Sequence, residues 1–429
     1  MSIYQYEQAF GAWDRTSGAM RKAIDRWFAM YYDGQAGESH DPCQRIPYTV
    51  VNKLVKAVFG EYKASTKTPF GERILAKLDE KKRLAMQLAL VGGVCYIKPC
   101  PVEAGFSFTL VPRNQVLIFG RDAEGRPTDI GLSERSMDGK YYYTLLERRT
   151  VDPEGYLTIS NRLFRSQDRQ NLGTEVPLKN VPAYRALAEE YRFPKPVGCV
   201  GLVDMKLPML NCVDGSNDGV SVYAAAEGLI RNIDQNEAQM CGEFSRGESR
   251  IIASSDLLDK ELGLQDHLFV GLDEDPERVG LTIFSPELRE QAYLARKQEY
   301  LRNVESMIGL KRGMLSDSNV EERTATEITA SAAEFSLTVM DFQLMWQKAV
   351  EQILALCKTL AQLYGFVETE PGTISFDWGN GTLYDQEKTW ADYMEMVDKG
   401  MLKPEVALAW RFGLTGESEQ AIREKMMPN

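Results

Sequence analysis

The chain has 429 residues, of which 44% are hydrophobic, and a formal net charge of −12 at pH 7. This length accommodates roughly two to three domains with sizeable cores. The negative charge excludes a protein that grips nucleic acid over a broad basic surface, but not one that surrounds nucleic acid without gripping it. Seven cysteines without a C-x-x-C pair, and only two histidines, argue against a disulfide framework, a zinc ribbon and a His-rich metal site.

The N-terminal part of the chain is predicted to be helical. Its apolar residues recur at the spacing of amphipathic helices, and the Gly92-Gly93 pair is expected to end the last of them. The predicted helices cover Ser17–Tyr32, Tyr48–Phe59 and Gly71–Leu90.

From Val94 to Phe164 the apolar period changes to two and β-forming residues dominate, which predicts strands. Turns such as Asp138-Gly139 suit an antiparallel meander. The predicted strands are Val94–Lys98, Phe106–Val111, Val116–Phe119, Thr128–Arg135, Tyr141–Arg149 and Tyr156–Phe164. The proline-rich segment 166–208 is predicted to hold loops and short strands.

The next part of the chain is predicted to be two helices around a small mixed insert. Asp218 is expected to cap a helix from Val220 to Phe244. Ser285 and Pro286 favour the start of a second helix, which runs to Ile308. The insert between the helices is predicted to contain strands at 250–252, 267–270 and 281–284.

One very long helix is predicted from Thr324 to Tyr364, because this stretch contains neither Gly nor Pro. Thr324 and Glu327 form a T-x-x-E capping box at its start, and Gly365 ends it. At a rise of ~1.5 Å per residue the helix is about 60 Å long. A small domain cannot cover a rod of this length alone.

Apolar residues follow one another along this helix in alternating steps of four and three, a seam with a 3.5-residue period. A second apolar row widens the hydrophobic face, so we expect neighbours on two sides. An ordinary coiled-coil or bundle helix carries the same seam, and this alternative stays open. The seam consists of Ile328, Ala332, Phe335, Val339, Phe342, Trp346, Ala349, Ile353, Leu356, Leu360 and Leu363, and the second row of Ala333, Leu337, Met340, Leu344, Leu354 and Ala361.

After the long helix we expect a strand over Thr373–Trp378, helices over Asp385–Lys399 and Pro404–Phe412, and a short tail helix over Glu417–Met426. The N-terminus does not read as a signal peptide, and no apolar run approaches the ~20 residues of a membrane span.

No catalytic, metal or cofactor site is expected. The chain lacks the G-x-x-x-x-G-K-[ST] phosphate loop, which excludes an NTPase of that type. The acidic run Asp273-Glu274-Asp275 offers ligands for a divalent cation, but its spacing is not that of a calcium loop and a solvated turn fits better. A carboxylate-dependent hydrolase using Asp273 and Asp275 is therefore a weak alternative.

Charged residues near the start of the long helix are candidate functional groups. Glu327, Glu334 and Asp341 fall seven residues apart, hence on one line of the helix. They form either a solvated face or a carboxylate stripe that repels an enclosed polyanion. Lys311 and Arg312, in the polar loop 309–323, either contact a phosphate backbone or belong to a generic exposed loop.

The order of these elements resembles that of the portal (head–tail connector) proteins of tailed bacteriophages. Particular residues carry the resemblance: the stretch Arg323–Glu327 (RTATE) is similar to a T-A-T-E motif of one branch of that family. Gly219–Tyr223, Tyr48–Glu61 and Met396–Leu402 are similar as well. The likeness covers essentially the whole chain, although each motif is short.

The resemblance implies an α+β fold of portal type, with a mixed wing domain, two stem helices, a small clip, one very long helix and a short helical crown. The implied parts are 1–217 as the wing (helical, then β-rich), 218–246 as the first stem helix, 247–287 as the clip, 288–308 as the second stem helix, 309–323 as the tunnel loop, 324–365 as the long helix, 366–382 as a strand that completes the wing, and 383–429 as the crown helices.

The resemblance also implies a function. Family members form rings of about twelve subunits around a DNA channel at one vertex of the capsid, which places the chain in the virion after assembly in the bacterial cytoplasm. The implied partners are double-stranded DNA, the terminase, the head–tail adaptor, and the major capsid and scaffold proteins, with no membrane and no enzymatic activity.

The candidate site residues take their roles within such a ring. Lys311 and Arg312 are expected near the DNA, and Glu327, Glu334 and Asp341 along the channel. The interface between subunits is expected at Phe335, Phe342, Trp346 and Ile353 of the long helix. The main alternative is an unrelated coiled-coil oligomer of roughly two to four chains, which dissociates when Phe342 and Ile353 become Asp.

Overall fold

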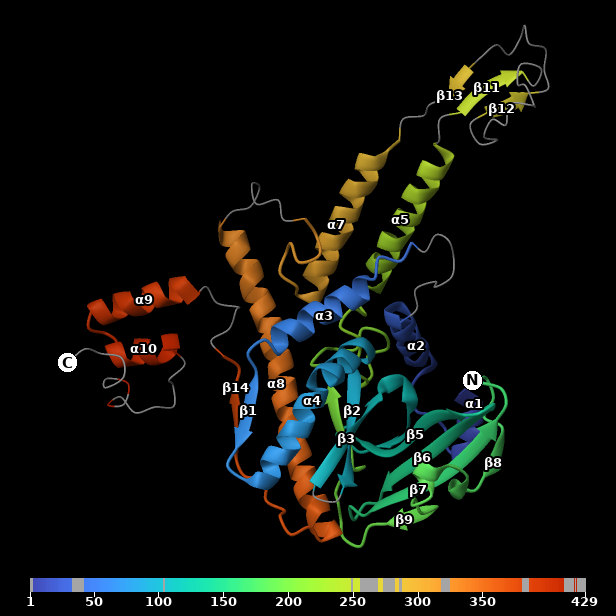
Figure 1. Ribbon diagram of the computed structural model, residues 1–429, viewed down its shortest axis with the longest axis vertical. Helices are drawn as coiled ribbons and strands as arrows, with labels where there is room; N and C mark the ends of the chain where they lie inside the picture. The colour runs from blue at the N-terminus through green and yellow to red at the C-terminus, as the bar shows by residue number, and fades with distance from the viewer. Residues whose placement is uncertain are drawn as a thin grey trace. The chain divides into compact units, whose positions relative to one another are not determined.

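The computed structural model describes most of the chain and divides it into two compact units (Figure 1). The first unit comprises Met1–Tyr31, Tyr48–Ala224 and Ala332–Asn429, and the second comprises Tyr32–Pro47 and Ala225–Ser331. The residues described are 3–32, 42–102, 105–247, 250–254, 269–272, 282–284, 288–317, 325–379, 386–412, 420 and 422.

The first unit contains an antiparallel meander, as the sequence predicts. Its strands are adjacent in the order β4-β5-β6-β7-β8, and β9 also pairs with β7. Gly125, Gly139 and Gly155 occupy the turns with φ between 59° and 87°, a conformation that glycine adopts without strain. The strands are β4 (Val116–Arg121), β5 (Pro127–Asp138), β6 (Tyr141–Val151), β7 (Leu157–Ser166), β8 (Thr174–Val176) and β9 (Glu190–Arg192).

A smaller antiparallel sheet in the order β10-β2-β3 shares a core with the meander. Its strands are β2 (Val94–Val102), β3 (Gly105–Pro112) and β10 (Val203–Lys206). Because side chains alternate along a strand, Val116 and Ile118 of β4 point into this shared core. Leu117 and Phe119 point to the opposite face, where they meet Phe10 at the end of α1 (Ile3–Phe10).

The predicted N-terminal helices are confirmed with small changes at their ends: α2 (Gly18–Tyr32), α3 (Ile46–Val58) and α4 (Pro69–Gly92). The hydroxyl of Thr68 accepts a hydrogen bond from Gly71 N and caps α4, and Gly93 ends it with φ 80°. The strand expected over 373–378 is β14 (Ile374–Asp377), and it pairs antiparallel with β1 (Lys63–Thr66), which the sequence analysis missed.

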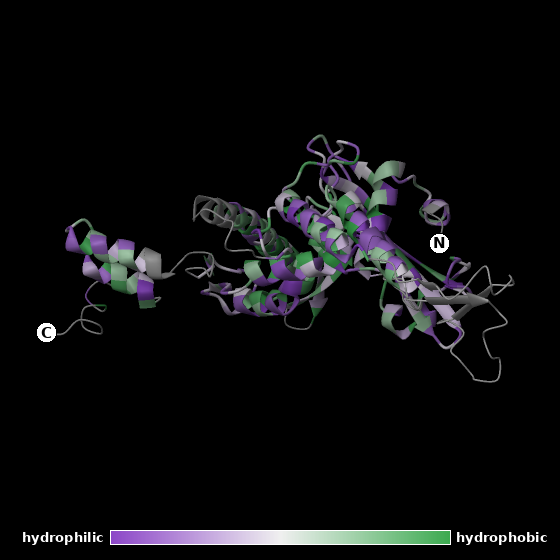
Figure 2. Ribbon diagram, turned by 90° about the horizontal axis from the view of Figure 1, so that it is seen from above, coloured by the Kyte–Doolittle hydropathy of each residue, from purple (hydrophilic) through white to green (hydrophobic). Residues whose placement is uncertain are grey.

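The long helix is confirmed as α8 (Ala325–Tyr364). Its seam residues from Phe335 to Leu360 are buried within the single chain. Trp346 contacts Phe59 edge-on with ring centroids 5.4 Å apart, and Tyr62 lies 6.4 Å from it. Figure 1 shows α8 running beside β1 and β14. Figure 2 shows hydrophobic and hydrophilic residues side by side along the helices, as amphipathic packing requires.

Helices α9 (Gln386–Asp398) and α10 (Pro404–Phe412) agree with the prediction and pack together, with the rings of Tyr393 and Trp410 5.0 Å apart. The expected tail helix lies outside the described residues, apart from positions 420 and 422.

The second unit contains two antiparallel helices side by side, α5 (Glu227–Arg246) and α7 (Glu290–Ile308) (Figure 1). Asn236 donates to the carbonyl oxygen of Tyr293 at 3.1 Å, and Lys297 pairs with Glu237 at 3.1 Å. The predicted mixed insert is confirmed as a sheet in the order β12-β11-β13, with one parallel and one antiparallel pairing. Its strands are β11 (Arg250–Ser254), β12 (Phe269–Leu272) and β13 (Thr282–Phe284).

The predicted start of the first of these helices is wrong. Asp218 does not cap a helix, and α5 begins at Glu227 instead of Val220. Val222 donates its N–H to Leu90 O at 2.9 Å, outside any helix, and its side chain is buried. A Cβ on Gly219 would lie 2.3 Å from the carbonyl oxygen of Gly93, so the stretch after Asp218 is pressed against the end of α4. Core packing therefore overrides the capping signal.

Candidate functional site

The exposed face of α8 borders a groove of about 740 Å³ in the first unit. The opposite wall consists of the end of β4, the turn 124–126, the segment 204–211 and the residues 216–218. The helix contributes Asp341, Leu344, Met345, Lys348, Ala349 and Gln352.

Large apolar side chains are exposed along this face and on the opposite wall. Leu337 is 63% exposed, Met340 45% and Leu344 59%, and they lie on one side of the helix because they are three and four residues apart. Leu210, on the opposite wall, is 95% exposed. Each Å² of apolar surface left in water costs about 25 cal/mol, so this face gains free energy when another surface covers it.

The charges that line the groove balance. Four cations and four anions line the groove. A mixture of both signs is better suited to binding a protein surface than to binding a phosphate group alone. Burial raises the pKa of Asp204 and lowers the pKa of Lys206, so both carry a desolvation cost in the groove wall. The cations are Arg121, Arg126, Lys206 and Lys348, and the anions Glu124, Asp204, Asp218 and Asp341.

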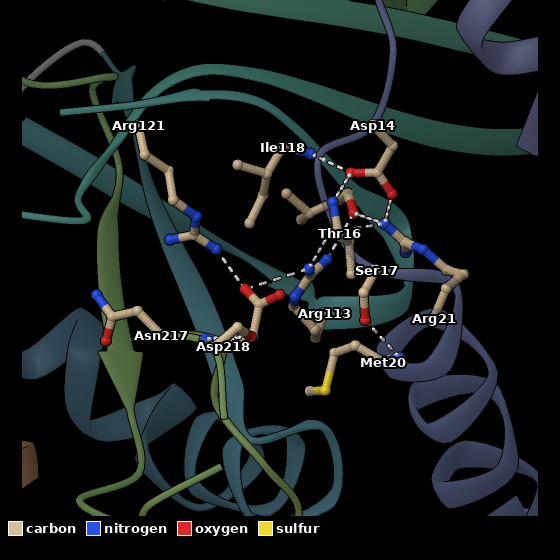
Figure 3. Close-up of polar contacts among 12 residues, drawn as sticks. Asp14, Thr16, Ser17, Met20, Arg21, Arg113, Ile118, Arg121, Asn217 and Asp218 are labelled. Atoms are coloured by element: carbon tan, nitrogen blue, oxygen red, sulfur yellow. Dashed lines mark hydrogen bonds and ion pairs between the residues drawn. The ribbon is translucent and has the colours of Figure 1, made fainter. Parts of the chain in front are cut away.

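A buried ion network supports the groove wall (Figure 3). Asp218 accepts a hydrogen bond from Arg121 and lies 3.6 Å from Nη2 of Arg113, which is completely buried. Arg113 also donates to Val116 O and to the hydroxyl of Thr16, both at 2.8 Å. The carboxylate of Asp218 is thus held between two guanidinium groups.

A second ion pair extends the network to α2. Arg21 donates to Asp14 and, at 3.2 Å, to Val116 O. Asp14 accepts from Ile118 N at 3.0 Å, which joins the segment before α2 to β4. Burial lowers the pKa of Arg21, and the neighbouring Arg113 lowers it further. The sequence offers no signal for this network, because it joins three parts of the chain that are about a hundred residues apart and that only the fold brings together.

We expect Asp218→Asn to destabilise the first unit by about 3 kcal/mol, because it leaves Arg113 as a buried cation without its carboxylate. The free energy of unfolding, measured by urea titration, checks this value. Asp138→Asn is the matched control, since Asp138 is exposed at the end of β5, and we expect it to change the stability by less than about 0.5 kcal/mol. An equal loss in both variants would contradict the role given to Asp218.

Two of the three predicted stripe carboxylates are visible on α8. Glu334 and Asp341 are exposed, and Asp341 lines the groove beside Leu344. They therefore border the exposed apolar row instead of forming a separate face. The backbone of Glu327 lies in α8, but its side chain is outside the described residues.

The four residues expected at the subunit interface have a different environment. Phe335, Phe342, Trp346 and Ile353 are at most 7% exposed in the single chain, so their own chain covers them. They are not available to a neighbouring subunit. Among the described side chains of α8, the row Leu337, Met340 and Leu344 stays exposed, although the sequence predicted it only as a widening of the seam.

Lys311 and Arg312 lie in the second unit, on an exposed turn after α7. The hydrogen bond from Met314 N to Lys311 O at 3.1 Å closes this turn, and Gly313 occupies its third position with φ 89°. The rest of the expected loop, 318–323, is outside the described residues, as is the acidic run Asp273–Asp275.

The described part of the chain contains no group of three or more His, Cys, Asp or Glu side chains that could hold a metal ion. None of the seven cysteines, all of which lie within the described residues, forms a disulfide, and burial raises the pKa of the Cys95 and Cys357 thiols. No described helix combines the length and apolar character that crossing a bilayer requires.

Residues 134–426 match the family model described as "Phage portal protein, SPP1 Gp6-like". No curated protein matches the chain. A solved structure, "Neck of native GTA particle computed with C12 symmetry", is similar with 13% identity and a TM-score of 0.47 over 96% of this chain and 99% of that chain. "Neck of empty GTA particle computed with C6 symmetry" has the same identity and TM-score, over 95% and 97%.

Proposed function

The chain belongs to the SPP1 Gp6-like family of phage portal proteins, and from this premise we propose that it forms a closed ring at one vertex of a phage capsid. The ring is the conduit for double-stranded DNA during packaging and ejection. It is also the docking platform for the terminase and the head–tail adaptor, and it contacts the major capsid and scaffold proteins. The chain performs no reaction in this proposal; ATP hydrolysis belongs to a partner.

The observation that carries the proposal is the two-sided character of α8. One face is buried within its own chain, whereas the opposite face exposes Leu337, Met340 and Leu344, and the last of these lines the groove. In a ring, one surface of each subunit contacts a different surface of the next. We propose that this exposed face with its groove is one of those two surfaces, and that about twelve subunits close the ring.

The charge distribution supports a conduit. With a net charge of −12 on each chain, the ring does not hold DNA over a broad basic surface, so DNA moves through it. We propose that Glu327, Glu334 and Asp341 repel phosphates near the channel, at the edge of the face that the next subunit covers. Lys311 and Arg312 make the few phosphate contacts, as the exposed cations of the turn after α7.

We propose the same parts of the subunit that the resemblance implies, except that the first stem helix begins later. This helix is α5, which begins at Glu227 instead of residue 218, and α7 is the second stem helix. The sheet β12-β11-β13 belongs to the clip, and β14 joins the N-terminal wing through β1.

Native mass spectrometry of the purified chain, with negative-stain images of the same sample, tests the proposal. A closed ring of about a dozen subunits with a central hole supports it. A stable particle of roughly two to four subunits without a hole contradicts it and favours the coiled-coil alternative. If the purified chain is monomeric, the same measurement is made on the particle assembled with scaffold and capsid proteins, and the absence of a ring there contradicts the proposal.

We expect Lys311→Ala combined with Arg312→Ala to leave the ring intact and to reduce DNA packaging and retention by about tenfold, because phosphate contacts that repeat around the ring are lost together. Packaged DNA per capsid checks this. The matched control is Lys81→Ala combined with Arg83→Ala, which removes two exposed cations from α4. Unchanged packaging in the first variant would remove these residues from the proposal.

A further inference from the structure

The chain folds back over the end of α7 and covers it. Gly309 has φ 74° and ends the helix, and Leu310 donates its N–H to Glu305 O at 2.9 Å. Leu310 is only 4% exposed, so the first residue after the helix cap is anchored in the core of the second unit. Asp317, at the other end of the segment, donates its N–H to the side-chain oxygen of Gln298 at 2.8 Å.

Between these two anchors a single buried carboxylate binds the segment. Glu305 is 1% exposed, and its carboxylate accepts hydrogen bonds from the backbone N–H groups of Gly313, Leu315 and Ser316. The distances are 3.1 Å to Gly313 N and 2.9 Å to Ser316 N. The hydroxyl of Ser316 donates to the second carboxylate oxygen at 2.8 Å.

The partners of Glu305 are mostly backbone groups. Among the ion pairs of the described residues, none includes Glu305, so backbone dipoles and one hydroxyl take the place of a cation. An apolar residue at this position would leave three N–H groups, among them that of the buried Ser316, without their acceptor. The carboxylate therefore specifies one conformation of the segment 313–316.

The segment places its two cations between fixed points. Lys311 and Arg312 are exposed, whereas Leu310 before them and Ser316 after them are buried. The turn that carries them is closed by the bond from Met314 N to Lys311 O, directly beside the N–H groups that Glu305 binds. The two cations consequently project from a turn that is joined to α7 on both sides.

We propose that Glu305 is a positioning residue that fixes the turn bearing Lys311 and Arg312 to the end of α7, so that the pair meets the DNA phosphates as a rigid unit. This inference rests on the proposed function for the role of the cations, but the clamp itself does not. A turn that is ordered before contact does not lose conformational freedom at each encounter with DNA. Any movement of α7 is also transmitted directly to the two cations.

Hydrogen exchange in the assembled full-length ring tests the clamp without reference to DNA. We expect Glu305→Ala to accelerate amide exchange at residues 313–316 by about tenfold or more. Glu305→Gln keeps one acceptor oxygen and should give an intermediate rate. The matched control is Glu299→Ala on the same helix, an exposed carboxylate that should leave exchange at 313–316 unchanged. Unchanged exchange in Glu305→Ala would overturn the clamp.

Packaged DNA per capsid tests the positioning role. We expect Glu305→Ala to reproduce the loss seen with the Lys311→Ala, Arg312→Ala variant at unchanged ring mass, and Glu305→Gln to restore part of it. Normal packaging in a Glu305→Ala ring with fast exchange would overturn the positioning role if the double alanine variant is defective. If the double variant also packages normally, the DNA role of the cations fails, while hydrogen exchange still decides the clamp. Should Glu305→Ala fail to assemble, Ser316→Ala and Glu305→Gln provide the same two readouts.

Discussion

Replacing Leu337 and Leu344 together by aspartate is expected to convert the ring into folded monomers. Both side chains are more than half exposed in the single chain, so the change alters the stability of the isolated subunit by only about 0.5 kcal/mol per site. In the proposed ring the next subunit covers the same positions. Two carboxylates without partners then cost several kcal/mol at every interface, on the order of the cost of a buried unpaired charge.

Native mass spectrometry tests whether the ring dissociates, and circular dichroism tests whether the monomer stays folded. The mass should fall from the ring to the single chain, while the thermal transition of the monomer should remain. Leu84→Asp is the matched control, because Leu84 is an exposed leucine on α4, away from the groove. A double aspartate variant that still forms rings would remove this face of α8 from the subunit interface.

The sequence predicts those features of the fold that depend on local periodicity. The change from helical spacing to a period of two at Val94 marks the start of β2, and the Gly-containing turns predict the meander β4 to β7. The absence of Gly and Pro predicts α8 almost to the residue. These signals succeed because a helix or a hairpin satisfies its backbone hydrogen bonds within one short stretch of chain.

Features that depend on distant residues could not be predicted in the same way. Asp218 has the side chain of an N-cap, but its partners Arg113 and Arg121 come from another part of the chain and retain it in an ion network. Glu305 reads as one more charged residue of a polar helix, because its acceptor role depends on how the next turn folds back. The spacing of residues along the sequence predicts neither role.

The seam of α8 illustrates a further limit. A 3.5-residue period predicts that a face is buried but does not identify which chain buries it. Here Trp346 packs on Phe59 and Tyr62 of the same subunit. The interface role expected for Phe335, Phe342, Trp346 and Ile353 therefore passes, as a proposal, to the exposed row. In the sequence, only the second apolar row of the same helix indicated that a single chain does not bury all of the helix's apolar side chains.

This distinction yields the second large prediction, that Phe342→Asp or Ile353→Asp unfolds the first unit instead of dissociating an intact subunit. Phe342 is 3% exposed and Ile353 is completely buried. An aspartate at either position loses the packing of a large side chain, about 2–5 kcal/mol, and buries a carboxylate without a partner. The sum approaches the entire stability of a typical domain, about 5–15 kcal/mol.

Urea unfolding and limited proteolysis measure this outcome, with the monomer of the Leu337→Asp, Leu344→Asp double variant as the reference for a folded single chain. We expect the Phe342→Asp and Ile353→Asp chains to lose their cooperative transition and to be cut within 332–364, whereas the reference resists. The coiled-coil alternative predicts the opposite, namely stable, protease-resistant monomers, because in a coiled coil the seam residues would contact only other chains. The same two aspartates therefore separate a helix whose seam belongs to its own fold from a helix whose seam builds the oligomer.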